Sequence, residues 1–161
     1  MKNILMAGSL LLWATTAGAQ DWVVGFGYTY FSESDADDSA VLSLEYHHEP
    51  FFTRGRWEIG AAFSLSAHTA GDVFAGVGIS GIYQLNDRWF LEGSVLPGLF
   101  IESSFENDLG SAFEIRSLLG LGYALNSGDR LSLAITHKSN ASTSSINPGV
   151  NAVQVRWRRR F

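Results

Sequence analysis

The chain has 161 residues, about the length of one domain, and a formal net charge of -5. The negative charge argues against a nucleic-acid partner, and the absence of cysteine excludes a disulfide framework and a thiolate metal site. Glycine is abundant (17 residues), aromatic residues make up 13% and proline occurs only 3 times, a composition that favours strands joined by tight turns.

The N-terminus carries the features of a secretory leader. Lys2 supplies a positive charge, an apolar run follows from Ile4 to Ala14, and Ala17-Gly18-Ala19 has the small residues of a cleavage site. This pattern predicts a signal peptide over residues 1–19 and a mature domain over residues 20–161. A membrane anchor is the alternative, but the apolar run is shorter than a spanning helix requires.

Alternation of apolar with small or polar residues predicts eight strands after the leader. Phe90 interrupts the alternation of the fifth strand, and the third strand shows it most clearly. Connections alternate between short turns and longer loops, among them an acidic loop over Glu33–Asp38. The predicted strands cover residues 22–31, 41–46, 56–65, 73–83, 89–95, 113–123, 130–140 and 151–161.

The charges of these strands fall on the face opposite the apolar one, and both signs are present. They can therefore pair inside a lumen too narrow to be a pore. This distribution predicts an all-β fold, an eight-stranded antiparallel transmembrane β-barrel of the outer-membrane type with a charged lumen filled by side chains. The charged residues are Glu45, Arg56, Glu58, Glu92, Glu114, Arg116, Arg130, Arg156 and Arg158.

A soluble sandwich or a lipocalin-like barrel would show the same alternation with the faces reversed. The signal peptide, the aromatic residues near strand ends and the terminal Phe161 favour the membrane barrel. An alternating last strand that ends in an aromatic residue resembles the assembly signal of outer-membrane barrels, although Arg159 departs from it. With both termini periplasmic, the loops at 33–38, 66–72, 101–111 and 140–148 are expected to be extracellular.

The predicted strand over 130–140 places His137 and Ser139 on its apolar face, beside Leu133 and Ile135. Placing polar side chains on an apolar face costs free energy, so their presence suggests a functional role. A serine becomes a nucleophile when a histidine accepts its proton, and a third group can orient that histidine. Asn151 shares this face on the final strand, and the hairpin places it beside His137. The topology sets the Ser-His-Asn group facing lipid, at outer-leaflet depth.

The run His137-Lys138-Ser139-Asn140-Ala141, followed by Asn147-Pro148-Gly149, resembles the H-x-S-N-A motif of the lipid A 3-O-deacylase (PagL-type) family. The resemblance implies a bacterial outer-membrane esterase that removes the 3-position acyl chain of lipid A, with lipopolysaccharide of the outer leaflet as substrate and no cofactor or metal. It implies Ser139 as nucleophile, His137 as general base, and Asn140 with nearby backbone N–H groups as oxyanion hole.

Two positions depart from the family pattern. Asn151 occupies the place of the family glutamate as third member of the triad, and Ser142 follows Ala141 where the family often has glycine.

Two other functions fit the same barrel. One is a non-catalytic structural or adhesion protein, and the other is a phospholipid acyl hydrolase. Outside the motif, Asp35, Asp37 and Asp38 form either a cation-binding or a solvated loop. His47-His48 is expected in a periplasmic turn and His68 in a loop.

Overall fold

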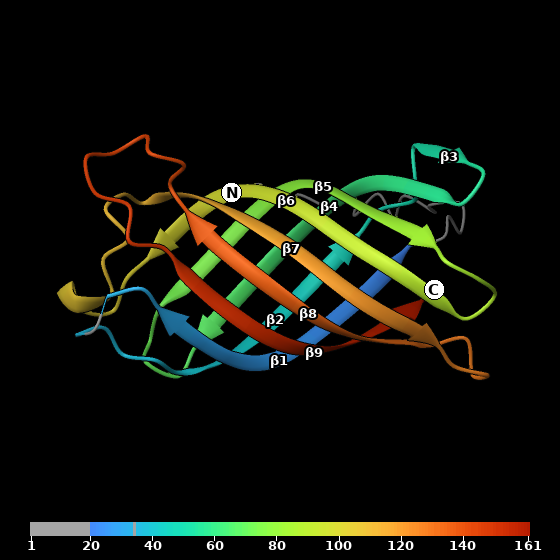
Figure 1. The fold of residues 1–161 in the computed structure, drawn as a ribbon, viewed down its shortest axis with the longest axis horizontal. Helices are drawn as coiled ribbons and strands as arrows, with labels where there is room; N and C mark the ends of the chain where they lie inside the picture. The colour runs from blue at the N-terminus through green and yellow to red at the C-terminus, as the bar shows by residue number, and fades with distance from the viewer. Residues whose placement is uncertain (1–19, 34) are drawn as a thin grey trace, which may run out of the picture.

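The computed structural model describes residues 20–33 and 35–161, which form one antiparallel β-sheet closed into a barrel (Figure 1). The strand order is β2-β1-β9-β8-β7-β6-β5-β4-β3, and pairing of β2 with β4 closes the barrel. The short strand β3 only extends the edge of β4, so the wall has eight strands, as predicted. The predicted signal peptide, residues 1–19, lies outside the described residues.

Apart from β2, which has 8 residues, the strands of the wall have 10 to 13 residues and are long enough to cross a bilayer when tilted. Their bounds are Asp21–Phe31 (β1), Ala40–His47 (β2), Trp57–His68 (β4), Val73–Gln84 (β5), Trp89–Ile101 (β6), Phe113–Ala124 (β7), Arg130–Ser139 (β8) and Val150–Arg160 (β9). Strand β3 covers Phe52–Arg54, and a single 3-10 turn, η1, covers Phe105–Asn107. No helix in the described part of the chain is long and apolar enough to span a membrane.

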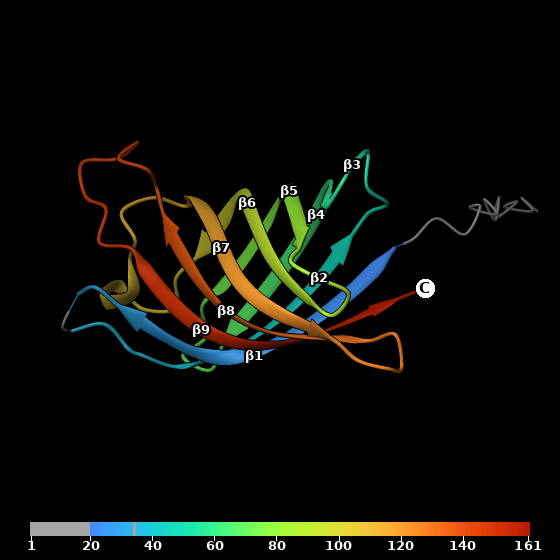
Figure 2. The same cartoon turned by 45° about the vertical axis from the view of Figure 1, so that its right-hand side comes forward.

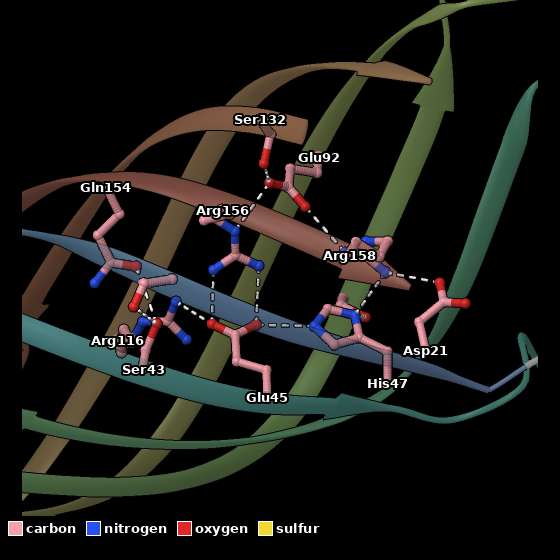
Figure 3. A network of polar contacts seen from close by, with 12 residues as sticks. Asp21, Ser43, Glu45, His47, Glu92, Arg116, Ser132, Gln154, Arg156 and Arg158 are labelled. Carbon is pink, nitrogen blue, oxygen red and sulfur yellow. Dashed lines mark hydrogen bonds and ion pairs between the residues drawn. The ribbon is translucent and has the colours of Figure 1, made fainter. Parts of the chain in front are cut away.

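The lumen is filled by an ionic network, shown in Figure 3. Both oxygens of Glu45 accept hydrogen bonds from the Arg156 guanidinium, at 2.7 and 3.0 Å, and Arg116 donates to the same carboxylate at 2.6 Å. Glu92 accepts from Arg156 at 3.0 Å and from Arg158 at 2.9 Å. The predicted pairing of lumenal charges is therefore confirmed for these five residues.

Two large aromatic side chains share the lumen with this network. Phe90 is buried, and its ring occupies the space beside Gly122, where a Cβ would lie 2.1 Å from a ring carbon. Phe74 is buried against Gly76 and Gly98 in the same way. Phe90 therefore interrupts the alternation, as predicted, because it is an apolar residue on the lumenal face of β6, opposite Gly122.

The outer wall is apolar and carries an aromatic belt at the end that holds the termini. Trp22–Tyr46, Trp57–Tyr83 and Trp89–Tyr123 are cross-strand ring pairs with centroids 5.2, 4.8 and 5.0 Å apart. Residues of this type gather at membrane–water interfaces. The end at which β1 starts and β9 ends, with the short turns, is on the right in Figures 1 and 2, and the longer loops are on the left.

Two histidines differ from their predicted places. His47 was expected in a turn, but it is the last residue of β2, and its buried ring contacts Glu45 and Ser80 at 2.8 and 3.0 Å. His68 was expected in a loop, but it is the last residue of β4 and is also buried. Both lie on the lumenal face of their strands, where polar side chains replace the water that a loop residue would contact.

Candidate active site

The hairpin of β8 and β9 brings His137 and Asn151 together. They are directly opposite in the register, and both side chains are on the exposed, lipid-facing side of the wall. His137 Nδ1 and Asn151 Oδ1 are 2.9 Å apart. An amide oxygen only accepts hydrogen bonds, so Nδ1 must carry the proton and Nε2 is left with its lone pair. The imidazole is thus held in the tautomer that a general base requires.

Ser139 lies one strand repeat above His137, on the same face and half-buried. Within the described residues, its hydroxyl makes no hydrogen bond to His137 Nε2. A hydrogen bond between a catalytic base and its nucleophile often forms only when substrate is bound. The geometry is therefore compatible with Ser139 as the nucleophile. The structure therefore brings Ser139, His137 and Asn151 onto one patch, and their catalytic roles stay predictions.

Gly149 leaves room for the imidazole of His137 because it has no side chain. A Cβ at this position would lie 3.1 Å from His137 Cε1 and 3.3 Å from the Lys138 carbonyl oxygen, and the φ of Gly149 is +73°. Any side chain here would both push against the ring and strain the backbone. The structure thus explains why the last residue of the Asn147-Pro148-Gly149 run is glycine.

Asn140 organises the loop above the site. Its buried Nδ2 donates to the carbonyl oxygens of Leu109, at 3.0 Å, and Ile146, at 2.7 Å, so it ties two outer loops together. Its backbone N–H donates to Asn147 Oδ1 at 3.0 Å, and its Oδ1 accepts from the Ser142 N–H at 3.0 Å. Every N–H of Asn140 is therefore engaged in holding the loop.

The two residues after Asn140 have an unusual backbone. Ala141 and Ser142 have φ values of +52° and +63°, the left-handed region that favours glycine. The Ala141 N–H makes no hydrogen bond in the described part of the chain. Strained backbone of this kind is found at functional sites. Ala141 is two residues after Ser139, the last residue of β8.

A buried polar chain lies behind the site, on the lumenal side of β8. Lys138 Nζ is 3.0 Å from His68 Nε2, and His68 Nδ1 is 3.4 Å from Asp72 Oδ2. Asn107 donates to Asp72 at 2.9 Å and accepts the Asp37 N–H at 2.8 Å. Sequence patterns did not predict this chain, because its members come from three loops and two strands.

Asp72 is an ionised member of that chain, in the loop between β4 and β5. Burial raises the pKa of its carboxyl, but hydrogen bonds from His68, Ser103 and Asn107 outweigh burial and lower the pKa to about 2. Ser103 donates to it through both its N–H and its hydroxyl, each at 2.8 Å. The carboxylate therefore connects the outer loops to the strand that carries the site.

Two adjoining shallow grooves mark the outer wall beside His137. The first, of about 310 Å³, lies between β7 and β8 at Ser117, Leu119 and Ile135. The second, of about 680 Å³, shares Ser117 and Leu119 and continues across β6, β5 and β4 to Trp57. Their linings are mainly apolar, so together they form a path from His137 toward the aromatic belt.

Gly81 and Gly93 form the floor of the larger groove, as cross-strand partners. A Cβ at Gly81 would meet its nearest atom at 3.5 Å and one at Gly93 at 3.4 Å, both ordinary contacts. Packing therefore does not require glycine at either position, in contrast to Gly122. What the two glycines do is leave the wall hollow.

The fold and the site together define a class: small outer-membrane β-barrels with a serine, a histidine and a third polar residue on the lipid-facing wall. The chain belongs to the lipid A 3-O-deacylase (PagL) family, whose sequence profile matches residues 43–160. A relative from Bordetella bronchiseptica, lipid A deacylase PagL, is 33% identical over 76 residues, which are 47% of this chain and 43% of the relative. The aligned stretch thus spans less than half of that relative.

Solved structures share the fold. The outer membrane enzyme PagL superposes with a TM-score of 0.67 at 18% identity, over 86% of this chain and 97% of that one. Ail, the attachment invasion locus protein of Yersinia pestis, gives 0.54 at 14% identity over 91% of this chain and 100% of its own. Neisserial surface protein A gives 0.54 at 9% identity, over 91% and 98%. These likenesses support the outer-membrane barrel.

Proposed function

We propose that this barrel hydrolyses an ester-linked acyl chain of lipid A, the 3-position chain, in the outer leaflet. The observation that carries the proposal is the hydrogen bond from His137 to Asn151, 2.9 Å long, on the lipid-facing wall one repeat below Ser139, in a member of this family. A polar triad on that wall meets lipid esters and is out of contact with the lumen.

In the proposed reaction, His137 Nε2 takes the proton of Ser139 as Oγ attacks the ester carbonyl carbon. The tetrahedral intermediate collapses when the sugar oxygen leaves with the proton from His137, which gives an acyl-serine. Water then attacks the acyl-serine, its proton passing to His137 and on to Oγ, and the fatty acid is released. Asn151 Oδ1 holds the ring in place and stabilises the imidazolium less than a carboxylate would.

The Ala141 N–H is the proposed donor to the oxyanion, because it makes no hydrogen bond in the described part of the chain and lies two residues after Ser139, in strained left-handed backbone. Asn140 is proposed to contribute by fixing this loop through its bonds to Leu109 and Ile146. A direct contribution from Asn140 Nδ2, as the family resemblance implies, would require it to give up one of those two carbonyl partners.

The groove of Ser117, Gly93 and Gly81 is the proposed path of the acyl chain. Ser117 is the cross-strand neighbour of His137, so a chain whose ester carbonyl is at Ser139 passes directly into it. The groove runs along the lipid-facing wall, where a chain can enter sideways from the leaflet without leaving apolar surroundings.

The test offers purified barrel either lipid A or phosphatidylethanolamine in the same detergent, with Ser139→Ala as the matched control, and measures fatty acid released. We expect release of a hydroxyacyl chain from lipid A by the parent protein alone. Release only from phosphatidylethanolamine would assign the phospholipid hydrolase instead. No release from either lipid by a folded parent would leave the structural or adhesion role.

A further inference from the structure

Among the residues that the structure describes, exposed positive charge lies at one end of the barrel. At the end where β1 starts and β9 ends, the exposed cations are Arg54, Arg56, Arg88, Arg159 and Arg160. At the loop end, the cations nearest the loops among the described residues are Lys138 and Arg116, both buried in the lumen. The exposed charges of the loop end are acidic, so the two ends face different chemistry.

Three of these arginines stand beside aromatic side chains of the belt. Arg88 donates to the Tyr123 hydroxyl at 3.0 Å, with its guanidinium carbon 5.8 Å from the ring centroid. Arg159 is the cross-strand partner of Trp22 and Arg54 is that of Trp57, so each shares the outer face with its tryptophan. These three residues, Arg54, Arg88 and Arg159, are called the arginine girdle.

The girdle lacks carboxylate partners. Within the described residues, none of its guanidinium groups forms an ion pair, whereas Arg160 pairs with Asp21 at 3.0 Å and lies within 3.8 Å of Glu58. Aromatic belts lie at the depth where acyl chains meet head groups. Guanidinium groups just outside the belt therefore reach the phosphate layer, and their planar forks suit phosphate oxygens.

We propose that the arginine girdle binds the phosphodiester head groups of anionic phospholipids in the leaflet at the terminal end, the inner leaflet of the outer membrane. Charge complementarity selects this occupant, because the girdle is the unpaired, lipid-facing cationic surface of the described chain. The bound head groups fix the depth of the barrel from the end opposite Ser139. The proposal does not depend on the proposed hydrolase.

The chain supplies a control for a charge-only effect. Arg56 is exposed at the same end, but its guanidinium donates to the Leu85 carbonyl oxygen at 3.0 Å and lines the polar mouth of the lumen with Arg130. None of the cross-strand pairs or ring contacts that define the girdle includes Arg56. Arg56→Gln therefore removes the same charge as Arg88→Gln without touching the girdle.

The experiment measures binding of phosphatidylglycerol to the purified full chain in micelles by native mass spectrometry, with phosphatidylcholine as the neutral lipid. We expect Arg88→Gln and Arg159→Gln each to weaken phosphatidylglycerol binding by about fivefold. The triple variant with Arg54→Gln should lose more than about tenfold. Arg56→Gln should bind as the parent does. A thermal unfolding transition is measured for each variant to show whether it is folded.

Several results would overturn the proposal. Equal binding by the parent and the folded triple variant would show that the girdle is not the site. An equal loss in Arg56→Gln would reduce the effect to net charge. If inorganic phosphate displaced phosphatidylglycerol at equal concentration, the ligand of the girdle would be a free anion and not a lipid. If the girdle preferred lipopolysaccharide to phosphatidylglycerol, its ligand would belong to the outer leaflet and the proposed inner-leaflet site would be wrong.

Discussion

At the scale of single residues, the third member of the triad decides how well His137 works. The 2.9 Å bond to Asn151 fixes the tautomer but brings no negative charge to the imidazolium. We expect Asn151→Glu to raise kcat for lipid A by about tenfold or more, because a carboxylate stabilises the cation formed in the transition state. The rate is measured in a fatty-acid release assay. The control is Asn151→Gln, whose side chain is as long as that of glutamate but neutral. A rate unchanged by Glu would show that charge at this position does not limit the reaction.

Ser142 is the second residue-scale case. Its φ of +63° lies in the left-handed region, which is costly for a residue with a side chain and accessible to glycine. Ser142→Gly should stabilise the loop by about 1 kcal/mol. Hydrogen exchange of the loop amides over residues 140–149 should slow, while Ser144→Gly, in the same loop, should not slow it. Faster exchange in Ser142→Gly would contradict the strain.

At the scale of elements, the groove across β5, β6 and β7 depends on two missing side chains. Gly93 has room for a Cβ, so Gly93→Leu should fold and fill the hollow. We expect at least about tenfold lower kcat/KM with long acyl chains, with short-chain esters hydrolysed as before. The equivalent Val153→Leu on β9, away from the groove, is the control. An equal loss for both chain lengths would show that the groove does not hold the chain.

The outer loops depend on Asp72, whose pKa is lowered to about 2. A lowered pKa means that its stabilisation is present above the ordinary value near 4 and is lost as the pH falls toward 2. Proteolysis of the loops by pepsin should therefore rise steeply between about pH 4 and pH 2. Asp72→Asn should already be cleaved at pH 5, and an unchanged cleavage profile in that variant would contradict the role.

The architecture of the whole barrel was predictable because it follows from the two-residue alternation of side chains along each strand. Alternation along β4 or β8 sets inside and outside together, and charges of both signs on one face indicated a filled lumen. The reason for the interruption at Phe90 could not be predicted, because the space for its ring is left by Gly122, a neighbour on another strand. The chain from Lys138 through His68 to Asp72 was missed for the same reason, since no local pattern joins positions 70 residues apart.

The whole molecule is also the scale of the central claim, that this barrel is a lipid A deacylase working through Ser139 in its own membrane. The most direct test is a mass spectrum of lipid A extracted from cells that carry the parent barrel or Ser139→Ala, both folded in the outer membrane. The account predicts loss of one hydroxyacyl chain with the parent and intact lipid A with the variant. Loss with both, or with neither, would contradict it.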